Sequence, residues 1–588
     1  MTEGEGLNAL PYFLESFENL TAHFDEHFDE LGSNERGDTF LNLAEKLVPL
    51  LDEFSGFPPP VPNQKKSHDQ GVDLLNSEPV DGKILCVQSK YKIKDKAAFD
   101  GVISKFKDFE TSLRPPKSQP DLFSGEQEEA PGVPVPIFVV VTSSKLEGLI
   151  QRYEGSVLAS RDYYDHLRAK NRLTILDGPK ILVILQHLYR KAHLIPSDIT
   201  LTSPHGWLNA GEVYIGAISG EDLTKLYDQH GDALFFENIR DFLGVSSGRV
   251  VTTRSTVNQE IIHTIHNEPN RMLARNNGIT FRSTEATLGE TNLLHLKRAA
   301  IVNGCQTTMC VVQVRPASGQ CLVPTKVVVT EDAWDIAKAT NYQNQVARVD
   351  LDLARYLRPQ LARRAAARLG YAVEADNEST ASAVLNTIYQ NKIDYEELRL
   401  LYLGLFSRKP VNIFETNYTE LRTDVLSFLY QQAECEEQIF SVILLMLKHS
   451  RDALNHCQKR FSAEEYSHIF KRFFKEDKPK YRSFLAVTAA STAIRDDISS
   501  RASDSLQETQ RMRTFLGKCR DILENHPNDF EAAYIHAFAA VADSLLDVVS
   551  GKDDSDIQQT MFKKVSSMPF DALYKRVLLR IDAQFLRD

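Results

Sequence analysis

The run Ile-Phe-Val-Val-Val-Thr at residues 137–142 limits the fold of this chain more than any other feature. Its residues are apolar and mostly β-branched, which is typical of a strand buried in the middle of a sheet. The six prolines in residues 113–136 predict a long surface loop just before it. This run therefore predicts an α/β domain in the N-terminal third of the chain.

The segments around the run supply the other elements of that domain. Two amphipathic helices, two strands and a third helix are predicted at residues 8–30, 38–54, Gly71–Leu75, Ile84–Ser89 and 96–112. Asp81-Gly82 between the two strands is a hairpin turn signal. A helix near 144–160 and strands near 172–186 follow the run. The order helix, strand, strand, helix, strand describes one α/β unit of roughly 190 residues.

The rest of the chain changes character near residue 400. At roughly 100–200 residues per domain, 588 residues suggest three or four domains. Strand-like runs such as Ala299–Val302 and Leu322–Thr330 predict a mixed α/β region, and the remainder reads as almost wholly helical. We therefore expect an α/β multidomain protein with an α/β domain at 1–200, a mixed α/β domain at 201–400 and an all-α domain at 401–588.

Three polar residues lie on the two strands of the predicted hairpin. Asp73 lies on the first strand, and Gln88 and Lys90 share one face of the second because strands have a period of two. Glu45 on the preceding helix adds a second carboxylate. Oxygen ligands hold a hard cation, and a nearby lysine steadies a charged transition state. These residues are also compatible with the solvated ends of an ordinary hairpin.

This arrangement resembles the PD-(D/E)xK nuclease superfamily, in the Mrr-like subgroup with QxK as second half-motif. The resemblance implies a restriction-endonuclease-like core that cleaves DNA with Mg²⁺ or Mn²⁺. Asp73, Gln88 and Glu45 would be metal ligands, and Lys90 the catalytic lysine. Val72 replaces the family's proline, and Gln88 replaces a carboxylate, which leaves the metal with less negative charge. The alternative is a degenerate nuclease fold that senses nucleic acid or a phage protein without cutting.

Four further stretches combine amides with apolar residues. They are LFFENIRDFL at 234–243, NNGIT at 276–280, IVNGCQTT at 301–308 and ATNYQNQ at 339–345. Amides both donate and accept, so a cluster of them can read a base edge or a nucleotide. The same residues can instead form a polar network that satisfies loop backbone. The ligand or nucleic-acid candidates are Asn276, Asn277, Asn303, Gln306, Asn341 and Gln343.

These four stretches, in this order, resemble the hallmark segments of the abortive infection phage resistance (AIPR) family. The resemblance covers about residues 213–400. It implies an antiviral defence protein that responds to a phage-encoded trigger. Nucleases of the type proposed above cut one strand per site, so we expect a homo-oligomer, most simply a dimer formed through the helical C-terminal region. The apolar stretches 436–448 and 533–549 are candidates for that contact.

Cysteine usage and charge bear on location and partners. The seven cysteines include no CxxC pair, and the N-terminus is acidic without an apolar leader segment. No run of about 18 apolar residues predicts a membrane span. We therefore expect a cytoplasmic protein with reduced thiols and no membrane partner. The net charge of −12 leaves nucleic-acid binding open, because a local basic patch decides phosphate contacts.

Overall fold

The computed structural model divides the chain into two compact units. The N-terminal unit contains Asn8–Ala192 and Glu378–Gln390, and the C-terminal unit contains His193–Asn377 and Asn391–Asp588. No helix in the described part of the chain is both long and apolar enough to cross a membrane. The structure describes residues 10–585 except 30, 64–70, 114–132, 195, 197, 238–250, 318, 320, 331–335, 337–358, 375–379, 390, 408, 415–420, 430–432, 462–468, 470–478, 503 and 550–553.

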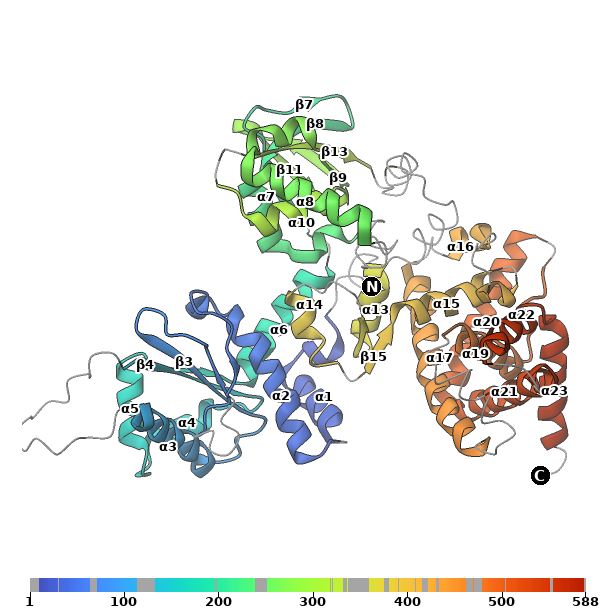
Figure 1. Ribbon diagram of the computed structural model, residues 1–588, viewed down its shortest axis with the longest axis horizontal. Coiled ribbons are helices and arrows are strands. Elements are labelled where there is room, and N and C mark those ends of the chain that lie inside the picture. The colour runs from blue at the N-terminus through green and yellow to red at the C-terminus, as the bar shows by residue number, and fades with distance from the viewer. Residues whose placement is uncertain are drawn as a thin grey trace, which may run out of the picture. The chain divides into compact units, whose positions relative to one another are not determined.

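The N-terminal unit is built on a five-stranded sheet in the order β1-β2-β3-β4-β5 (Figure 1). Its strands are β1 (Val61–Pro62), β2 (Leu74–Leu75), β3 (Lys83–Lys90), β4 (Val135–Thr142) and β5 (Leu173–Leu176). Strand β2 pairs antiparallel with both β1 and β3, whereas β4 pairs parallel with both β3 and β5. The predicted central strand is confirmed as β4, in which Phe138–Val141 are all fully buried.

Helices cover both faces of this sheet. They are α1 (Phe17–Asp29), α2 (Ser33–Leu47), α3 (Lys96–Leu113), α4 (Glu147–Glu154), α5 (Arg161–Ala169) and α6 (Gly178–His193). On one face, Phe138 and Val140 of β4 share a core with side chains of α3, α4 and α5. Helix α2 packs against β3. The helix predicted near 144–160 is confirmed as the shorter α4, and α5 follows beyond that range.

The predicted hairpin turn is confirmed. Val80 and Lys83 exchange backbone hydrogen bonds of 2.9 Å in both directions. Asp81 and Gly82 between them have φ of 50° and 72°. Two left-handed residues form the turn whose twist matches that of the flanking strands, so this turn sets the register of β3 against β2.

The strands predicted near 172–186 are half wrong. Only Leu173–Leu176 form a strand, and the apolar run that follows belongs to α6. Leu182, Leu185 and Tyr189 of that run are buried at helical spacing, whereas Val183 is 64% exposed. A short Ile-Leu-Val-Ile-Leu run fits a buried strand and a buried helix equally well, so periodicity alone misassigned it.

A short segment from the second half of the chain completes the N-terminal unit. Helix α14 (Thr380–Leu385) lies in the connection between β14 (Tyr371–Glu374) and β15 (Asn391–Asp394), which pair in parallel in the C-terminal unit. Within the N-terminal unit α14 packs against α2, and Lys46 Nζ donates to Ala383 O over 3.3 Å. The connection between two strands of one unit is thus part of the other unit's structure.

The first part of the C-terminal unit holds two sheets, ordered β12-β9-β13-β8-β7 and β10-β11-β6. Their strands are β6 (Asp198–Thr202), β7 (Leu208–Asn209), β8 (Val213–Ser219), β9 (Ile279–Ser283), β10 (Glu285–Leu288), β11 (Leu293–Lys297), β12 (Ala300–Asn303) and β13 (Leu322–Val329). The accompanying helices are α7 (Gly220–His230), α8 (Val251–Asn267), α9 (Met272–Arg275), α10 (Cys305–Val314) and α13 (Pro359–Arg368). Side chains of both sheets, among them Leu294 and Phe281, share one core. The predicted mixed α/β region is confirmed.

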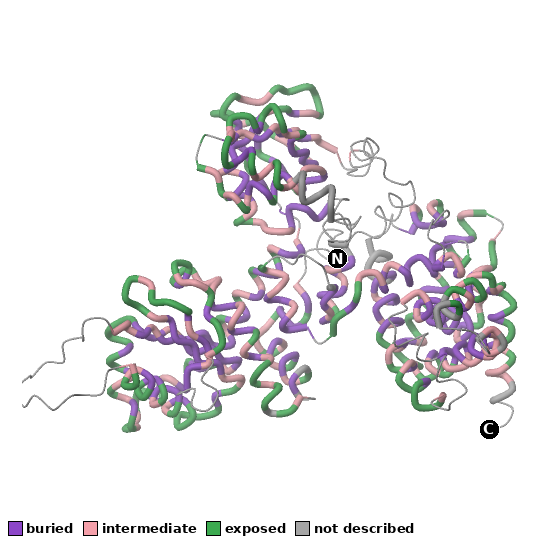
Figure 2. The backbone as a smooth tube through the Cα atoms, in the orientation of Figure 1, coloured by how far each residue is buried: buried purple, intermediate pink, exposed green. Residues whose placement is uncertain are grey.

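The remainder is helical, as predicted. Its helices are α15 (Tyr395–Phe406), α16 (Thr423–Leu429), α17 (Ala433–Arg460), α19 (Pro479–Ile494), α20 (Ser505–Asn525), α21 (Pro527–Val549), α22 (Asp554–Ser566) and α23 (Phe570–Phe585). The apolar stretches 436–448 and 533–549 lie in α17 and α21, and their buried side chains belong to one core. Figure 2 colours much of the backbone of the helical region as buried. Neighbouring helices therefore bury these stretches, which leaves them no role as a contact between copies.

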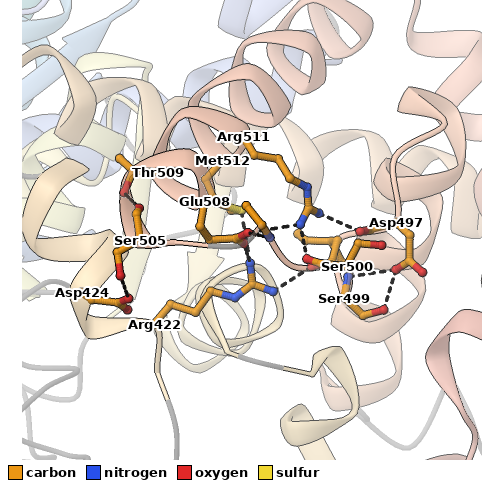
Figure 3. Close-up of polar contacts among 12 residues, drawn as sticks. Arg422, Asp424, Asp497, Ser499, Ser500, Ser505, Glu508, Thr509, Arg511 and Met512 are labelled. Atoms are coloured by element: carbon orange, nitrogen blue, oxygen red, sulfur yellow. Dashed lines mark hydrogen bonds and ion pairs between the residues drawn. The ribbon is translucent and has the colours of Figure 1, made fainter.

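A buried ion pair joins α20 to the segment before α16. Arg422 and Glu508 are 5% and 8% exposed and are directly paired. Figure 3 shows Arg511 on the other side of Glu508, with Arg422 and Arg511 also reaching the 496–500 segment. Arg422 donates to Ile498 O over 2.8 Å, and Arg511 to Asp497 O over 2.7 Å. Arginine donors thus hold the connection between α19 and α20 in place.

Candidate functional site

The local fold brings Asp73 beside the end of β3. Asp73 directly precedes β2, and its backbone N–H donates to Val87 O over 2.8 Å. Gly71 has a φ of +78°, and a Cβ there would lie 2.3 Å from the Lys105 side chain on α3. Glycine therefore permits both the left-handed turn and the close approach to α3 that lead the chain into Asp73.

Asp73 is hydrogen-bonded to two groups of β3. Its Oδ2 accepts from Gln88 Nε2 at 2.6 Å and from the Ser89 backbone N–H at 2.7 Å. Gln88 Nε2 also donates to Ser89 O over 3.2 Å. Two oxygen acceptors thus determine which end of the Gln88 amide is nitrogen, because the flipped amide would place oxygen against both. Asp73 and Gln88, paired in our sequence analysis, therefore form one polar group.

The other end of the Gln88 amide is a buried acceptor without a donor. Gln88 is 1% exposed, and its Oε1 has no hydrogen-bond partner within the described structure. An unsatisfied buried oxygen normally costs about 1–3 kcal/mol, so such atoms call for an explanation. Mg²⁺ and Mn²⁺ take carboxylate and amide oxygens as ligands. The donor chemistry of Asp73 and Gln88 therefore suits a divalent cation, although the amide turns its NH₂ group toward Asp73.

Lys90 lies on the strand of Gln88, and Glu45 lies on the helix that packs against that strand; neither bonds to the Asp73–Gln88 pair. Lys90 is half-buried at the end of β3, two residues beyond Gln88 and on the same face. Its ammonium makes no hydrogen bond or ion pair with any residue that the structure describes. Glu45 is half-buried on α2, the helix that packs against β3, and likewise has no partner among those residues.

The carboxylate count of the site is low. Within the described ranges, no group of three or more His, Cys, Asp and Glu residues is arranged to hold a metal ion. A cation here would depend on Asp73, on the amide oxygen of Gln88 and on solvent, with Glu45 as the remaining carboxylate nearby in the fold. Mg²⁺ commonly keeps several waters and uses only one or two protein carboxylates. The arrangement therefore favours a weakly held, hydrated ion.

Sequence reasoning missed the contacts that fix the chain just after Lys90. Asp25 of α1 accepts a 2.6 Å hydrogen bond from Tyr91 Oη and pairs with Lys92. Partial burial opposes ionisation of Asp25, but the Lys92 and Tyr91 hydrogen bonds outweigh it and lower the pKa of this carboxylate. The only signal in the sequence was the acidic helix itself, and nothing in it indicated which acid reaches β3.

In the C-terminal unit the structure gathers two of the amide-rich stretches at one end of a sheet. Asn276 Oδ1 accepts from Gly278 N at 2.8 Å and from Thr307 Oγ1 at 3.1 Å. A Cβ on Gly278 would lie 2.4 Å from Pro324 O, and one on Gly304 would lie 2.8 Å from Gly278 O. Both glycines have positive φ. Close backbone packing therefore requires glycine at both positions, and Asn276 is a structural link.

The other amides of these stretches differ from Asn276. Asn277 is exposed, whereas Asn303 and Gln306 are half-buried beside the first turn of α10. The side chains of Asn303 and Gln306 make no hydrogen bond with any residue in the described ranges. Two further candidates, Asn341 and Gln343, lie outside the described residues.

Comparison with known proteins bears on this second region. A family model described as AIPR protein matches residues 235–560. The match includes the stretches around Asn276 and Asn303, and it continues well beyond residue 400 into the helical region, farther than our sequence analysis placed the resemblance. No curated protein and no solved structure matches the chain. Because the model covers more than half of the 588 residues, the chain belongs to the AIPR protein family.

Proposed function

We propose that the N-terminal unit is a metal-dependent nuclease that hydrolyses phosphodiester bonds in DNA. The observation that carries the proposal is the buried Gln88 Oε1, which has no hydrogen-bond donor in the described structure and lies on the amide bonded to Asp73. The order helix, antiparallel hairpin, helix, parallel strand around these residues supports it as well. That is the element order expected from the resemblance to PD-(D/E)xK nucleases.

The chain's own residues have distinct roles in this proposal. Asp73 and Gln88 provide oxygen ligands whose geometry is set by the Gln88–Asp73 and Ser89–Asp73 hydrogen bonds. When bound, a divalent cation such as Mg²⁺ or Mn²⁺ would supply Lewis acidity that polarises a phosphoryl oxygen and lowers the pKa of a bound water. Lys90 presents a cation with no protein partner in the described residues, so its charge is available to a phosphate oxygen. In this proposal Glu45 accepts a proton from the attacking water or holds that water by a hydrogen bond.

A second candidate function is nucleic-acid or phage-protein sensing without cleavage. The observation that favours it is the amide at position 88, where a carboxylate would bind a cation more strongly. Among the described residues the site offers only the carboxylates of Asp73 and Glu45. In that case the Asp73–Gln88 hydrogen bond would be a structural remnant of a nuclease fold.

Family membership supports a role in antiphage defence by abortive infection. In this account a phage-encoded component triggers the protein, and DNA cleavage follows. Double-strand cleavage by single-strand cutters requires two copies, so we propose that the active form is a homodimer. The buried stretches in α17 and α21 do not form the interface of this dimer. The proposal of a dimer is based on the requirement of double-strand cleavage for two active sites.

The test compares the full-length protein with Asp73→Ala on supercoiled plasmid DNA, with Mg²⁺, with Mn²⁺ and with EDTA. We expect cleavage by the unchanged protein with either metal, no cleavage in EDTA, and none by Asp73→Ala. Equal cleavage by both proteins would place the active site elsewhere. Binding of DNA without cleavage in any metal would favour the sensing function.

A further inference from the structure

We infer that Lys92, Lys94 and Lys145 form a phosphate-binding surface, the basic edge, that holds the nucleic-acid backbone leading to Lys90. This inference deepens the proposed nuclease function and rests on it for the role of Lys90. The three lysines are exposed, and they follow directly on the ends of β3 and β4. Crevices at the carboxyl ends of parallel strands are where α/β sheets bind ligands.

The chain after β3 alternates inward and outward residues. Ile93 is buried, and its N–H donates to Ser144 Oγ over 2.9 Å, so the extended segment is held against the end of β4. Lys92 and Lys94 on either side of it are exposed. Burial of Ile93 leaves Lys92 and Lys94 on the outer side of this segment. Two exposed ammonium groups therefore follow the end of β3, beyond Lys90.

Lys145 joins these lysines from the neighbouring strand. Lys90 is in register with Thr142, and Ser143 N donates to Tyr91 O over 3.1 Å. Lys145 follows two residues later and is exposed. Neither it nor Lys94 makes an ion pair with any residue that the structure describes. Two strand ends thus present unpaired ammonium groups at one edge of the sheet.

Two carboxylates near these lysines accept backbone hydrogen bonds, whereas Glu147, two residues beyond Lys145, is exposed. Asp95 accepts from Ala98 N at 2.8 Å at the start of α3, and Asp177 accepts from Leu146 N at 3.2 Å. Asp25 differs from these two acids, because it pairs with Lys92, one of the three lysines of the basic edge. A phosphate approaching Lys92 must displace or share that contact. We therefore expect Asp25 to weaken nucleic-acid binding while the other two acids leave it unaffected.

A chain with net charge −12 can still bind a polyanion where its lysines gather, because local cations make the phosphate contacts. Each ammonium that neutralises a phosphate releases condensed counterions, so binding weakens with salt by a slope of about 0.9 per contact. A contact to phosphate carries no sequence information, and its loss weakens binding to all sequences alike.

The experiment measures binding of the full-length protein to a short fluorescent DNA duplex in EDTA, where no cleavage is required. The variants are Lys94→Ala, Lys145→Ala and the double change, followed between about 50 and 200 mM salt. Lys83→Ala is the matched control, because Lys83 is an exposed lysine at the other end of β3, roughly 23 Å away. Asp25→Asn removes the charge beside Lys92 but keeps an oxygen acceptor for Tyr91.

We expect each lysine variant to bind more weakly, with the salt slope reduced by about 0.9 per lysine. Lys83→Ala should bind as the unchanged protein does, and Asp25→Asn should bind more tightly. The inference would be overturned if the salt slope of DNA binding did not change in the lysine variants, or if Lys83→Ala weakened binding as much as they do. It would also be overturned if the unchanged protein did not bind DNA. Binding that follows this pattern without plasmid cleavage in metal would instead refute the nuclease and leave the basic edge standing.

Discussion

Gln88 donates its side-chain N–H to Asp73 Oδ2 over 2.6 Å and leaves its own Oε1 buried without a donor in the described structure. A second carboxylate at position 88 would instead face Asp73 as a like charge. With an amide at position 88, the two side chains can lie together without a cation, and the amide oxygen can still serve as a ligand. Whether a cation binds that oxygen distinguishes a metal site from a degenerate nuclease fold.

Gln88→Glu should make the stability of the N-terminal unit depend on metal. In EDTA, the half-buried Asp73 and the new carboxylate at the buried position 88 repel each other, and the melting temperature should fall by about 2–4 °C for each kcal/mol lost. Mg²⁺ or Mn²⁺ should restore it, because the added charge binds the ion. Gln88→Met, which is similar in size and uncharged, is the control and should show no rescue. Thermal melts with and without metal decide, and equal melts for Gln88→Glu in both conditions would argue against a cation site.

Much of the N-terminal fold is predictable, because it follows from local patterns. A few adjacent residues determine the β4 strand, and two adjacent residues determine the Asp81-Gly82 turn. The place of helix α14 was unpredictable. It lies in a connection between two strands of the C-terminal unit but belongs to the N-terminal unit, where it packs against α2, and no local pattern indicates that packing. The same limit applies to the site. Strand alternation brought Gln88 and Lys90 together, but the Asp25 contact depends on how α1 packs.

The two asparagines Asn276 and Asn303 should respond differently to truncation. Asn276→Ala leaves Gly278 N and Thr307 Oγ1 without their acceptor, so it should cost about 1–3 kcal/mol of stability. Asn303→Ala and Gln306→Ala remove no hydrogen bond seen in the described structure and should leave the melting temperature unchanged. We expect them to reduce phage protection all the same. Normal protection by both variants, measured by plaque assay at matched protein levels, would show that these amides have no role in defence.

The N-terminal unit should lose stability in mild acid through His23. This ring lies against Phe13 with centroids 4.3 Å apart, and its Nε2 is 2.7 Å from Ile388 O. Burial lowers the pKa of His23 below its ordinary value of 6.5, more than the Ile388 contact raises it. The unfolded chain therefore binds the proton first. Stability is complete above pH 6.5 and falls below it, by up to about 1.4 kcal/mol per pH unit until the folded pKa is reached.

His23→Gln is the variant that isolates this effect. It keeps a donor for Ile388 O but has no proton to gain, so urea unfolding between about pH 7 and pH 5 should show a shallower loss. His187, whose pKa burial also lowers, is present in both proteins and cancels from the comparison. An identical pH dependence in the two proteins would show that His23 is solvated.

Arg422→Met should destabilise the helical region strongly. Glu508 is 8% exposed, and without Arg422 its remaining partners in the described residues are Arg511 and the Ala502 N–H, which donates over 2.8 Å. Removing one partner of a buried pair costs about 3–5 kcal/mol, because the other charge stays buried. The double change Arg422→Met with Glu508→Gln should recover part of that loss. A single-variant cost under about 1 kcal/mol by urea unfolding would indicate a solvated pair instead.

The most direct test of the nuclease account is plasmid cleavage by Lys90→Ala, with Lys83→Ala as the matched control. Both lysines lie on β3, but only Lys90 lies on the face of Gln88 beside the Asp73 site. Lys90 is half-buried without a partner in the described residues, so its loss should leave the melting temperature unchanged. We predict that Lys90→Ala abolishes metal-dependent cleavage and that Lys83→Ala cleaves at the unchanged rate. Cleavage by folded Lys90→Ala at the unchanged rate would contradict the account.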